Sequence, residues 1–271
     1  MSRLRVALVQ LAADQDVAAN VERAVDLVKR AGERRPQLIA LPECFLYRGP
    51  AAGFRGSASE LPGPMTEPFA ELARSLDTWI LLGSVAERSA DPQRPYNTSV
   101  LLDPAGQICA CYRKRHLFDV TIDGGPSDRE SARTTPGDET VVAVMEGAAR
   151  EADVRLGLSI CFDLRFPEIY REMALAGAAA MAVPANFTEA TGRDHWEVLL
   201  RARAIENGAF VIAPAQCGAG GGVPSHGRSM VVDPWGVVIA QAPDGPGVVV
   251  ADLEMERVAE VRRQLPTQPE R

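Results

Sequence analysis

The 271-residue sequence lacks several motifs that would point directly to a class of protein. It contains neither the G-x-S-x-G motif of serine hydrolases nor the H-E-x-x-H motif of zinc proteases. Its three histidines, His116, His195 and His226, are too widely spaced to form a metal-binding motif. Five cysteines in so long a chain do not make a disulfide framework, so we expect a reducing, cytoplasmic setting. We also expect no bound metal.

Long apolar runs and basic clusters are also missing. The longest weakly polar run, from Ala174 to Pro184, is too short to span a bilayer, and the first residues lack the apolar stretch of a signal peptide. The chain has 29 basic and 36 acidic residues, a formal net charge of −7. That balance disfavours a nucleic-acid binder and a polybasic membrane contact. We expect neither a nucleic acid nor a membrane as a partner.

The apolar patterns that are present predict an α/β fold. The short apolar runs at Arg5–Gln10 and Gln37–Glu43 flank a helical pattern that ends at Gly32, which is typical of a βαβ unit. About a dozen strand patterns and about five helical patterns follow one another with no linker between them. We therefore predict a single domain over residues 1–271. So many strands in one domain favour two sheets packed face to face, with helices outside, over one open sheet.

Three further local patterns lead to predictions. Residues 119–138 are rich in glycine, proline and charge and are predicted to be a loop. Asp194 and Glu197 resemble a capping box, so a helix is predicted from there through Ile205. The run from Gly218 starts like a dinucleotide-binding fingerprint, but Val223 stands where the third glycine belongs. This makes a nucleotide-dependent oxidoreductase the weaker hypothesis, and no cofactor is expected.

Three polar side chains follow predicted strands, at the positions where α/β folds place reactive groups. Glu43 ends the run Ala40-Leu41-Pro42, Lys114 follows the strand that ends near Tyr112, and Cys161 ends an apolar strand. Each alone has an ordinary structural interpretation. A single cysteine is most often a small buried apolar residue, and a glutamate or lysine at a strand end is usually solvated. The three together are a more specific signal.

The sequence resembles the carbon–nitrogen hydrolase (nitrilase) superfamily from Arg5 to about Pro266. That family has a Glu, a Lys and a Cys in this chain order, each at the end of a strand. The resembling segments are Leu41-Pro42-Glu43, Tyr112-Arg113-Lys114-Arg115-His116-Leu117-Phe118, Cys161-Phe162-Asp163-Leu164-Arg165-Phe166-Pro167-Glu168, Pro184-Ala185-Asn186-Phe187, His195 to Glu206, and Ser229 to Gly236.

The chemistry of these residue types fits the roles that the resemblance implies. A thiolate is a strong nucleophile, and with no evident histidine partner a buried carboxylate must accept its proton. Cys161 is thus the expected nucleophile and Glu43 the base, and Lys114 would stabilise the oxyanion together with the Phe162 N–H group. The resemblance also implies a second glutamate before the cysteine strand, a position that Glu130 matches. It further implies a four-layer α-β-β-α sandwich of two mixed sheets with outer helices.

The residues after Cys161 indicate a branch of the superfamily. Cys161-Phe162-Asp163 resembles the amidase branch that acts on deaminated glutathione and α-keto acid ω-amides, whereas nitrilases have Cys-Trp-Glu. The expected reaction is hydrolysis of a small, carboxylate-bearing amide through a thioester on Cys161. Alternatives are a relative acting on N-carbamoyl compounds or nitriles, and a catalytically silent binding module on the same fold.

The resemblance also implies substrate contacts and an assembly. Phe162, Arg165, Asn186 and Phe187 are the expected substrate-binding residues. Arg165, Arg193 and Arg228 are the candidates for the cation that binds the substrate carboxylate. A homodimer joined through helices is expected, with small-molecule amide and water as the other partners. The candidate dimer contacts, or alternatively core positions of the monomer, are Ile169, Met173, Ala176, Leu199 and Leu200.

Overall fold

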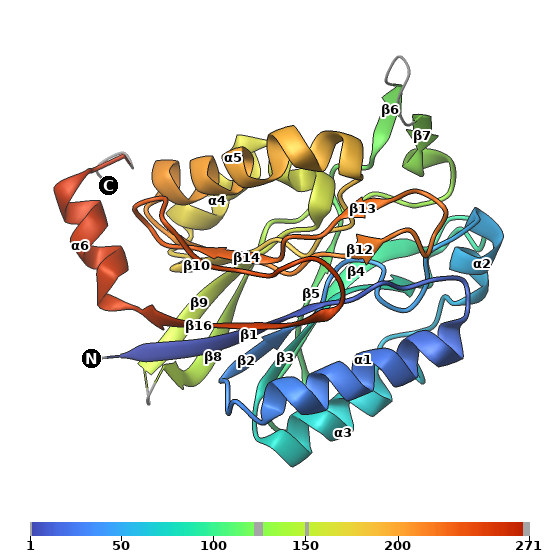
Figure 1. The fold of residues 1–271 in the computed structure, drawn as a ribbon, viewed down its shortest axis with the longest axis horizontal. Helices are drawn as coiled ribbons and strands as arrows, with labels where there is room; N and C mark the ends of the chain where they lie inside the picture. Colours follow the sequence, from blue (N-terminus) through green and yellow to red (C-terminus); the bar gives the residue numbers. More distant parts are fainter. Residues whose placement is uncertain (1, 122–126, 150–151, 268–271) are drawn as a thin grey trace.

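The computed structural model describes residues 2–121, 127–149 and 152–267, and Figure 1 shows them as two sheets between two layers of helices. The first sheet has the strand order β16-β1-β2-β3-β4-β5, and the central strands β1, β2 and β3 are parallel. Its strands are β1 (Arg3–Gln10), β2 (Leu38–Ala40), β3 (Trp79–Glu87), β4 (Tyr96–Leu102), β5 (Ile108–Arg113) and β16 (Gly247–Glu254).

The second sheet is built in a similar way, with the order β15-β14-β11-β10-β9-β8 and parallel central strands β9, β10 and β11. Its strands are β8 (Val141–Ala149), β9 (Ala152–Leu158), β10 (Ala180–Ala182), β11 (Phe210–Ala213), β14 (Met230–Val232) and β15 (Val238–Gln241). In both sheets the outer strands pair antiparallel, so both sheets are mixed.

The alternation of side chains along β1 shows how the layers are held together. Leu4, Val6 and Leu8 belong to the core that lies between the sheets, and Ala7 and Val9 belong to a second core beneath the helices. Successive residues of a strand point to opposite faces, so a strand buried on both faces reads as a continuous apolar run.

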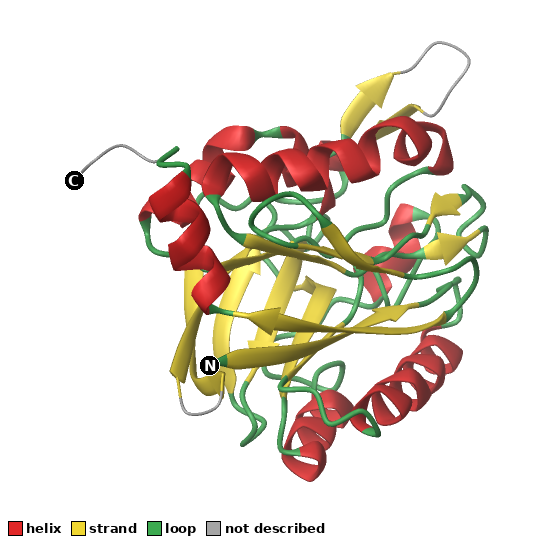
Figure 2. Cartoon of the chain, turned by 60° about the vertical axis from the view of Figure 1, so that its left-hand side comes forward, coloured by secondary structure: helices red, strands yellow, loops and turns green. Residues whose placement is uncertain are grey.

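Helices cover the outer face of each sheet, as Figures 1 and 2 show. Helices α1 (Val17–Gly32) and α3 (Glu67–Leu76) cover the first sheet, and α4 (Pro167–Leu175) and α5 (Glu189–Asn207) cover the second. The other described elements are short α2 (Ala51–Gly56), C-terminal α6 (Glu256–Gln264), the 3-10 turns η1 (Glu130–Ala132) and η2 (Cys161–Arg165), and the strand pairs β6 (Asp119–Thr121) with β7 (Ser127–Arg129) and β12 (Cys217–Gly218) with β13 (Ser225–His226). The predicted four-layer α-β-β-α sandwich is confirmed. The single-domain boundary stays a prediction.

Two local predictions are wrong. Helix α5 begins at Glu189, so Asp194 lies inside the helix and caps nothing. The segment predicted as a loop contains the β6–β7 pair and η1, although Gly124, Gly125 and Pro126 fall outside the described residues. Within the described part of the chain, no helix is both long and apolar enough to cross a membrane.

Candidate active site

Strand ends of both sheets bring the predicted reactive residues together. Glu43 lies three positions after β2, Lys114 follows β5 directly, and Cys161 lies three positions after β9. Strands β2 and β9 are in different sheets, so the carboxylate and the thiol face each other across the layer boundary. All three side chains are at least nine-tenths buried.

Cys161 is held in an unusual backbone conformation at the start of η2. Its φ angle is +48°, in the left-handed region that L-residues rarely adopt, and its N–H group donates to the Pro184 carbonyl at 2.9 Å. Strain of this kind persists only where the surroundings enforce it, and it is concentrated at functional sites. The turn places the Cys161 side chain near Glu43, whose carboxylate acts on the pKa of the thiol.

The thiol of Cys161 stays protonated in the free protein. Burial, followed by the adjacent Glu43 carboxylate, raises the pKa of the Cys161 thiol well above its usual value, and Lys114 opposes this only in part. The nucleophile has to be formed during the reaction by proton transfer.

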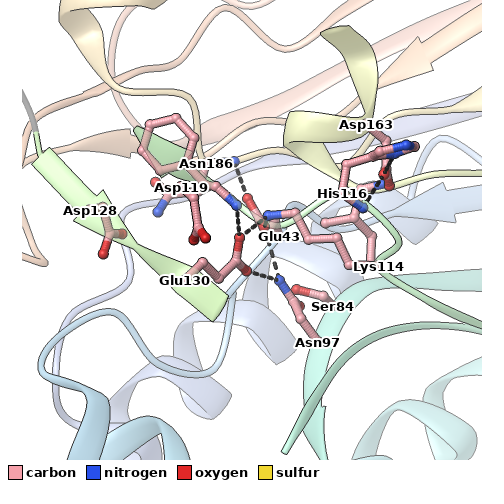
Figure 3. A network of polar contacts seen from close by, with 12 residues as sticks. Glu43, Ser84, Asn97, Lys114, His116, Asp119, Asp128, Glu130, Asp163 and Asn186 are labelled. Carbon is pink, nitrogen blue, oxygen red and sulfur yellow. Dashed lines mark hydrogen bonds and ion pairs between the residues drawn. The ribbon is translucent and has the colours of Figure 1, made fainter. Parts of the chain in front are cut away.

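Lys114 lies between two carboxylates, as Figure 3 shows. Its Nζ atom is 2.9 Å from Glu43 Oε1 and 2.8 Å from Glu130 Oε2. Burial alone lowers the pKa of the Lys114 ammonium, but Glu130 and Glu43 outweigh it and hold that pKa well above its usual value. Lys114 is therefore a permanent buried cation, and Glu130, the second glutamate predicted from the resemblance, is one of its two partners.

Asn97 is a site residue that the sequence did not reveal. It lies in β4, and its Nδ2 donates to Glu43 Oε1 at 3.0 Å and to Glu130 Oε1 at 3.3 Å. The backbone N–H of Asn186 donates to the other oxygen of Glu43 at 2.8 Å (Figure 3). Glu130 is also fixed by the Phe118 N–H group at 2.7 Å. These donors hold both carboxylates in one orientation, which is what an acid–base group requires.

Asp163 joins the lysine segment to the cysteine turn. Its carboxylate accepts from Tyr112 Oη at 2.7 Å, from the backbone N–H groups of His116 and Ile160, and contacts His116 Nδ1 at 2.7 Å. The His116 ring also stacks on Phe166. His116 therefore has a structural role, and Asp163 fixes the separation between Lys114 and Cys161.

A cavity opens over Cys161, with a volume of about 490 Å³ that includes open solvent. All four expected substrate-binding residues, Phe162, Arg165, Asn186 and Phe187, line it. Arg165 lies over the rings of Phe162 and Phe187 and donates to His195 Nδ1 at 3.2 Å.

Of the three candidate arginines, the structure places only Arg165 at this cavity. Arg193 pairs with Glu189 and Arg228 with Asp244, and both line a different part of the surface. The geometry therefore favours Arg165 over Arg193 and Arg228 as the partner of a substrate carboxylate, and this choice stays a prediction.

The donor sets do not suggest a metal centre. The described residues contain no group of three or more His, Cys, Asp or Glu side chains arranged to hold a metal ion. The carboxylates near Cys161 are instead occupied by Lys114, Asn97 and backbone N–H groups.

A mixed four-layer sandwich with a strand-end thiol, glutamate and lysine defines a class of cysteine-dependent hydrolase, and comparison with known proteins gives the family. The family model described as "Carbon-nitrogen hydrolase" matches residues 5–263. The match covers nearly the whole chain, so this protein belongs to the carbon–nitrogen hydrolase family, as the sequence predicted.

Individual relatives show the same similarity. The chain is 40% identical to human deaminated glutathione amidase over 267 residues. The alignment covers 96% of this chain and 80% of the relative. The chain is 34% identical over 268 residues to human omega-amidase NIT2, covering 98% and 94% of the two chains. The crystal structure of the C. elegans NitFhit protein superposes with a TM-score of 0.88 and 36% identity. That alignment covers 98% of this chain and 64% of the NitFhit chain.

Proposed function

We propose that this protein is an amidase that hydrolyses the C–N bond of a small, carboxylate-bearing amide through a thioester on Cys161. The observation that carries the proposal is the convergence of a buried thiol, two oriented carboxylates and a permanent cation in one cavity. Structural sites seldom bury such a combination, because each unsatisfied charge would cost several kcal/mol.

The first half-reaction forms the thioester and releases the amine. The Cys161 Sγ atom attacks the amide carbon while its proton moves to the neighbouring carboxylate of Glu43. The carbonyl oxygen becomes an oxyanion in the tetrahedral intermediate. When this intermediate collapses, the C–N bond breaks and Glu43 returns the proton to the leaving nitrogen. The amine departs and the acyl group remains on Cys161.

The second half-reaction hydrolyses the thioester. A water molecule attacks the thioester carbon and transfers a proton to Glu43. The C–S bond then breaks, Glu43 returns the proton to Cys161 Sγ, and the carboxylic acid leaves. Glu130 is the auxiliary carboxylate in both steps. It shares the Lys114 ammonium with Glu43 and thereby keeps Lys114 charged and in place.

Two donors face the oxygen of the tetrahedral intermediate. Lys114 supplies a full positive charge, and Phe162 supplies a backbone N–H group from the first turn of η2. The first N–H groups of a helical turn have no partner within the turn, so they are available to an oxyanion. A donor aimed at such an oxyanion in a dry site typically changes the rate by about 100-fold or more.

Arg165 gives the site its preference for anionic substrates. It is half-buried beside Phe162 and Phe187, where burial lowers the pKa of the guanidinium without removing its charge. A carboxylate on the acyl half of the substrate would pair with it. Deaminated glutathione and the ω-amides of α-keto dicarboxylic acids both have such a carboxylate, and these are the substrates that we propose.

The test is a comparison of kcat/KM for three matched substrates: an α-keto acid ω-amide or deaminated glutathione, a neutral aliphatic amide of similar length, and the corresponding nitrile. We expect the anionic amide to react at least about tenfold faster than the neutral amide, with the nitrile slower still, because a missing carboxylate leaves Arg165 unpaired. Preference for the nitrile, the neutral amide or an N-carbamoyl compound would contradict the substrate assignment. No turnover of any of them would favour the silent module.

We also propose that the protein is a homodimer. Of the candidate contacts that the sequence offered, Ile169, Met173 and Leu200 are fully buried in the monomer, which is the alternative interpretation given for them above. The structure offers an exposed apolar patch instead, on α5 and the β14–β15 turn. It comprises Val198, Ile205, Trp235 and Val237. The Nε group of Arg201 on α5 donates to the Gly236 carbonyl at 2.8 Å, which ties the turn to the helix.

A reducing, cytoplasmic location completes the proposal. All five cysteines are free thiols, and Cys109 and Cys111 are exposed. Exposed thiols and a catalytic thiol are best preserved in a reducing compartment.

A further inference from the structure

A second cavity continues from the first and leads away from Arg165. Its volume is about 1340 Å³, open solvent included. It shares seven lining residues with the cavity over Cys161, namely Cys44, Phe118, Asp128, Glu130, Arg133, Asn186 and Thr188. Arg165, Phe162 and Phe187 line the first cavity but not the second. The site therefore has two arms, and only one of them contains the cation assigned so far.

The two arms meet beside the groups that orient Glu43. Glu43 lines the first cavity only, Asn97, which donates to it, lines the second only, and Asn186 and Glu130 line both. In the proposed function the carboxylate of the acyl half pairs with Arg165 in the first arm, and the leaving nitrogen lies next to Glu43, which gives it a proton. The amine half then extends past Glu43, away from Arg165, into the second arm.

Arg48 is a buried cation in the second arm. Its exposed fraction is 5%, and it lines the second cavity but not the first. Its guanidinium donates to three backbone carbonyls, those of Val223 at 2.8 Å and of Cys217 and Gly218 at 3.4 Å each. No carboxylate of the described residues forms an ion pair with it. The carboxylates nearest the arm are occupied, Glu130 by Lys114 and Asp128 by Arg133.

Burying a guanidinium without an anion beside it is unfavourable for the free energy of folding. Carbonyl oxygens satisfy some of its five N–H donors, but they do not neutralise its charge. Burial lowers the pKa of the Arg48 guanidinium, and Cys44, Cys217 and Glu43 oppose this only in part. A carboxylate entering the arm would form charge-assisted hydrogen bonds to it and remove that cost.

We propose that Arg48 binds a carboxylate on the amine half of the substrate. This inference rests on the proposed amidase function and narrows it. The preferred substrate has an anionic group on each side of the scissile amide, one for Arg165 and one for Arg48. Deaminated glutathione meets this requirement, because its cysteinylglycine half ends in a carboxylate. An ω-amide does not, because its leaving group is ammonia.

The experiment compares kcat/KM for deaminated glutathione and for its C-terminal carboxamide, with the ω-amide of the same acyl half as a third substrate. We expect wild type to favour the carboxylate over the carboxamide by about tenfold or more. In Arg48→Met this ratio falls to about one. In Arg55→Met, which removes an exposed cation from neighbouring α2, the ratio is unchanged. Arg48→Lys keeps the positive charge but lacks the planar guanidinium that can form two parallel hydrogen bonds to a carboxylate. Its carboxylate-to-carboxamide ratio of kcat/KM should be intermediate.

Arg48 also holds the loop that contains Gly218 and Val223, so Arg48→Met could unfold locally. We therefore add an inhibition measurement on wild type, which does not depend on the folding of the variant. Cysteinylglycine should inhibit about tenfold more strongly than cysteinylglycinamide. Equal kcat/KM values or equal inhibition in wild type would overturn the inference, as would an unchanged ratio in a folded Arg48→Met. Each of those outcomes leaves the amidase function standing. Only failure to hydrolyse all three substrates would contradict the function itself.

Discussion

Lys114 keeps its charge in a buried site because two carboxylates face it. Replacing it in Lys114→Met removes the cation that stabilises the oxyanion, and kcat should fall by about 100-fold or more. Arg113→Met is the matched control, since Arg113 pairs with Glu87 outside the cavity and should lose less than about tenfold. Steady-state kinetics on both variants, with folding checked by circular dichroism, make the comparison. A near-normal rate in folded Lys114→Met would make this lysine structural only.

The thiol of Cys161 provides a pH-dependent test of its environment. Burial and the Glu43 carboxylate both raise the pKa of this thiol. Glu43→Gln removes the negative charge, so the pKa of the Cys161 thiol should fall while amidase activity is lost. Alkylation by iodoacetamide depends on thiolate, and its rate should therefore reach a given value at a lower pH in Glu43→Gln than in wild type.

Peptide mass spectrometry would follow Cys161 separately from the exposed Cys109 and Cys111. The control is Glu139→Gln, an exposed glutamate that should leave the profile unchanged. A Cys161 profile that is unmoved or shifted to higher pH in Glu43→Gln would contradict the charge coupling described above.

Among the secondary-structure elements, the turn after β2 depends on close packing against β3. A Cβ atom added at Gly83 of β3 would overlap the backbone carbonyl oxygen of Leu41 and the Pro42 backbone, next to Glu43. Gly83→Ala should cost about 1–3 kcal/mol, lower Tm by about 5 °C and reduce activity, because the turn that presents Glu43 has to move. Gly56→Ala is the control, since nothing lies within 4 Å of its added Cβ. Thermal unfolding of both variants tests this, and equal Tm values would argue against the tight contact.

The strand ends explain how much of the site could be predicted from the sequence. Glu43, Lys114 and Cys161 follow short apolar runs that are unmistakable in sequence, and the resemblance pointed to Glu130. Asn97 was missed because it lies within a strand, and no local pattern tells that it faces a carboxylate across the sheet. The start of α5 was misplaced because Asp194 and Glu197 have the spacing of a capping box although they lie inside the helix. The helix begins at Glu189, and Gly192 within it lies close to His226.

At the scale of the whole molecule, the proposed dimer depends on the apolar patch of α5 and the β14–β15 turn. Val198 is 66% exposed on this patch. Val198→Glu introduces a charge that would be buried at the interface, so the variant should shift from dimer to monomer at micromolar concentration. Light scattering measures the mass, and Val144→Glu, an exposed valine on β8, is the control. If wild type were monomeric at high dilution and still fully active, the dimer would not be required for activity.

Glu43 and Lys114 follow strands of the first sheet, and Cys161 follows a strand of the second. We propose that these residues together form and hydrolyse a covalent acyl intermediate on Cys161. The most direct measurement is mass spectrometry of enzyme quenched with acid during turnover of an anionic amide. The account predicts that the peptide containing Cys161 gains the mass of the acyl half, and that Cys161→Ala gains none and loses turnover while remaining folded. An acyl group on another residue, or a Cys161→Ala variant that keeps most of its activity, would contradict the account.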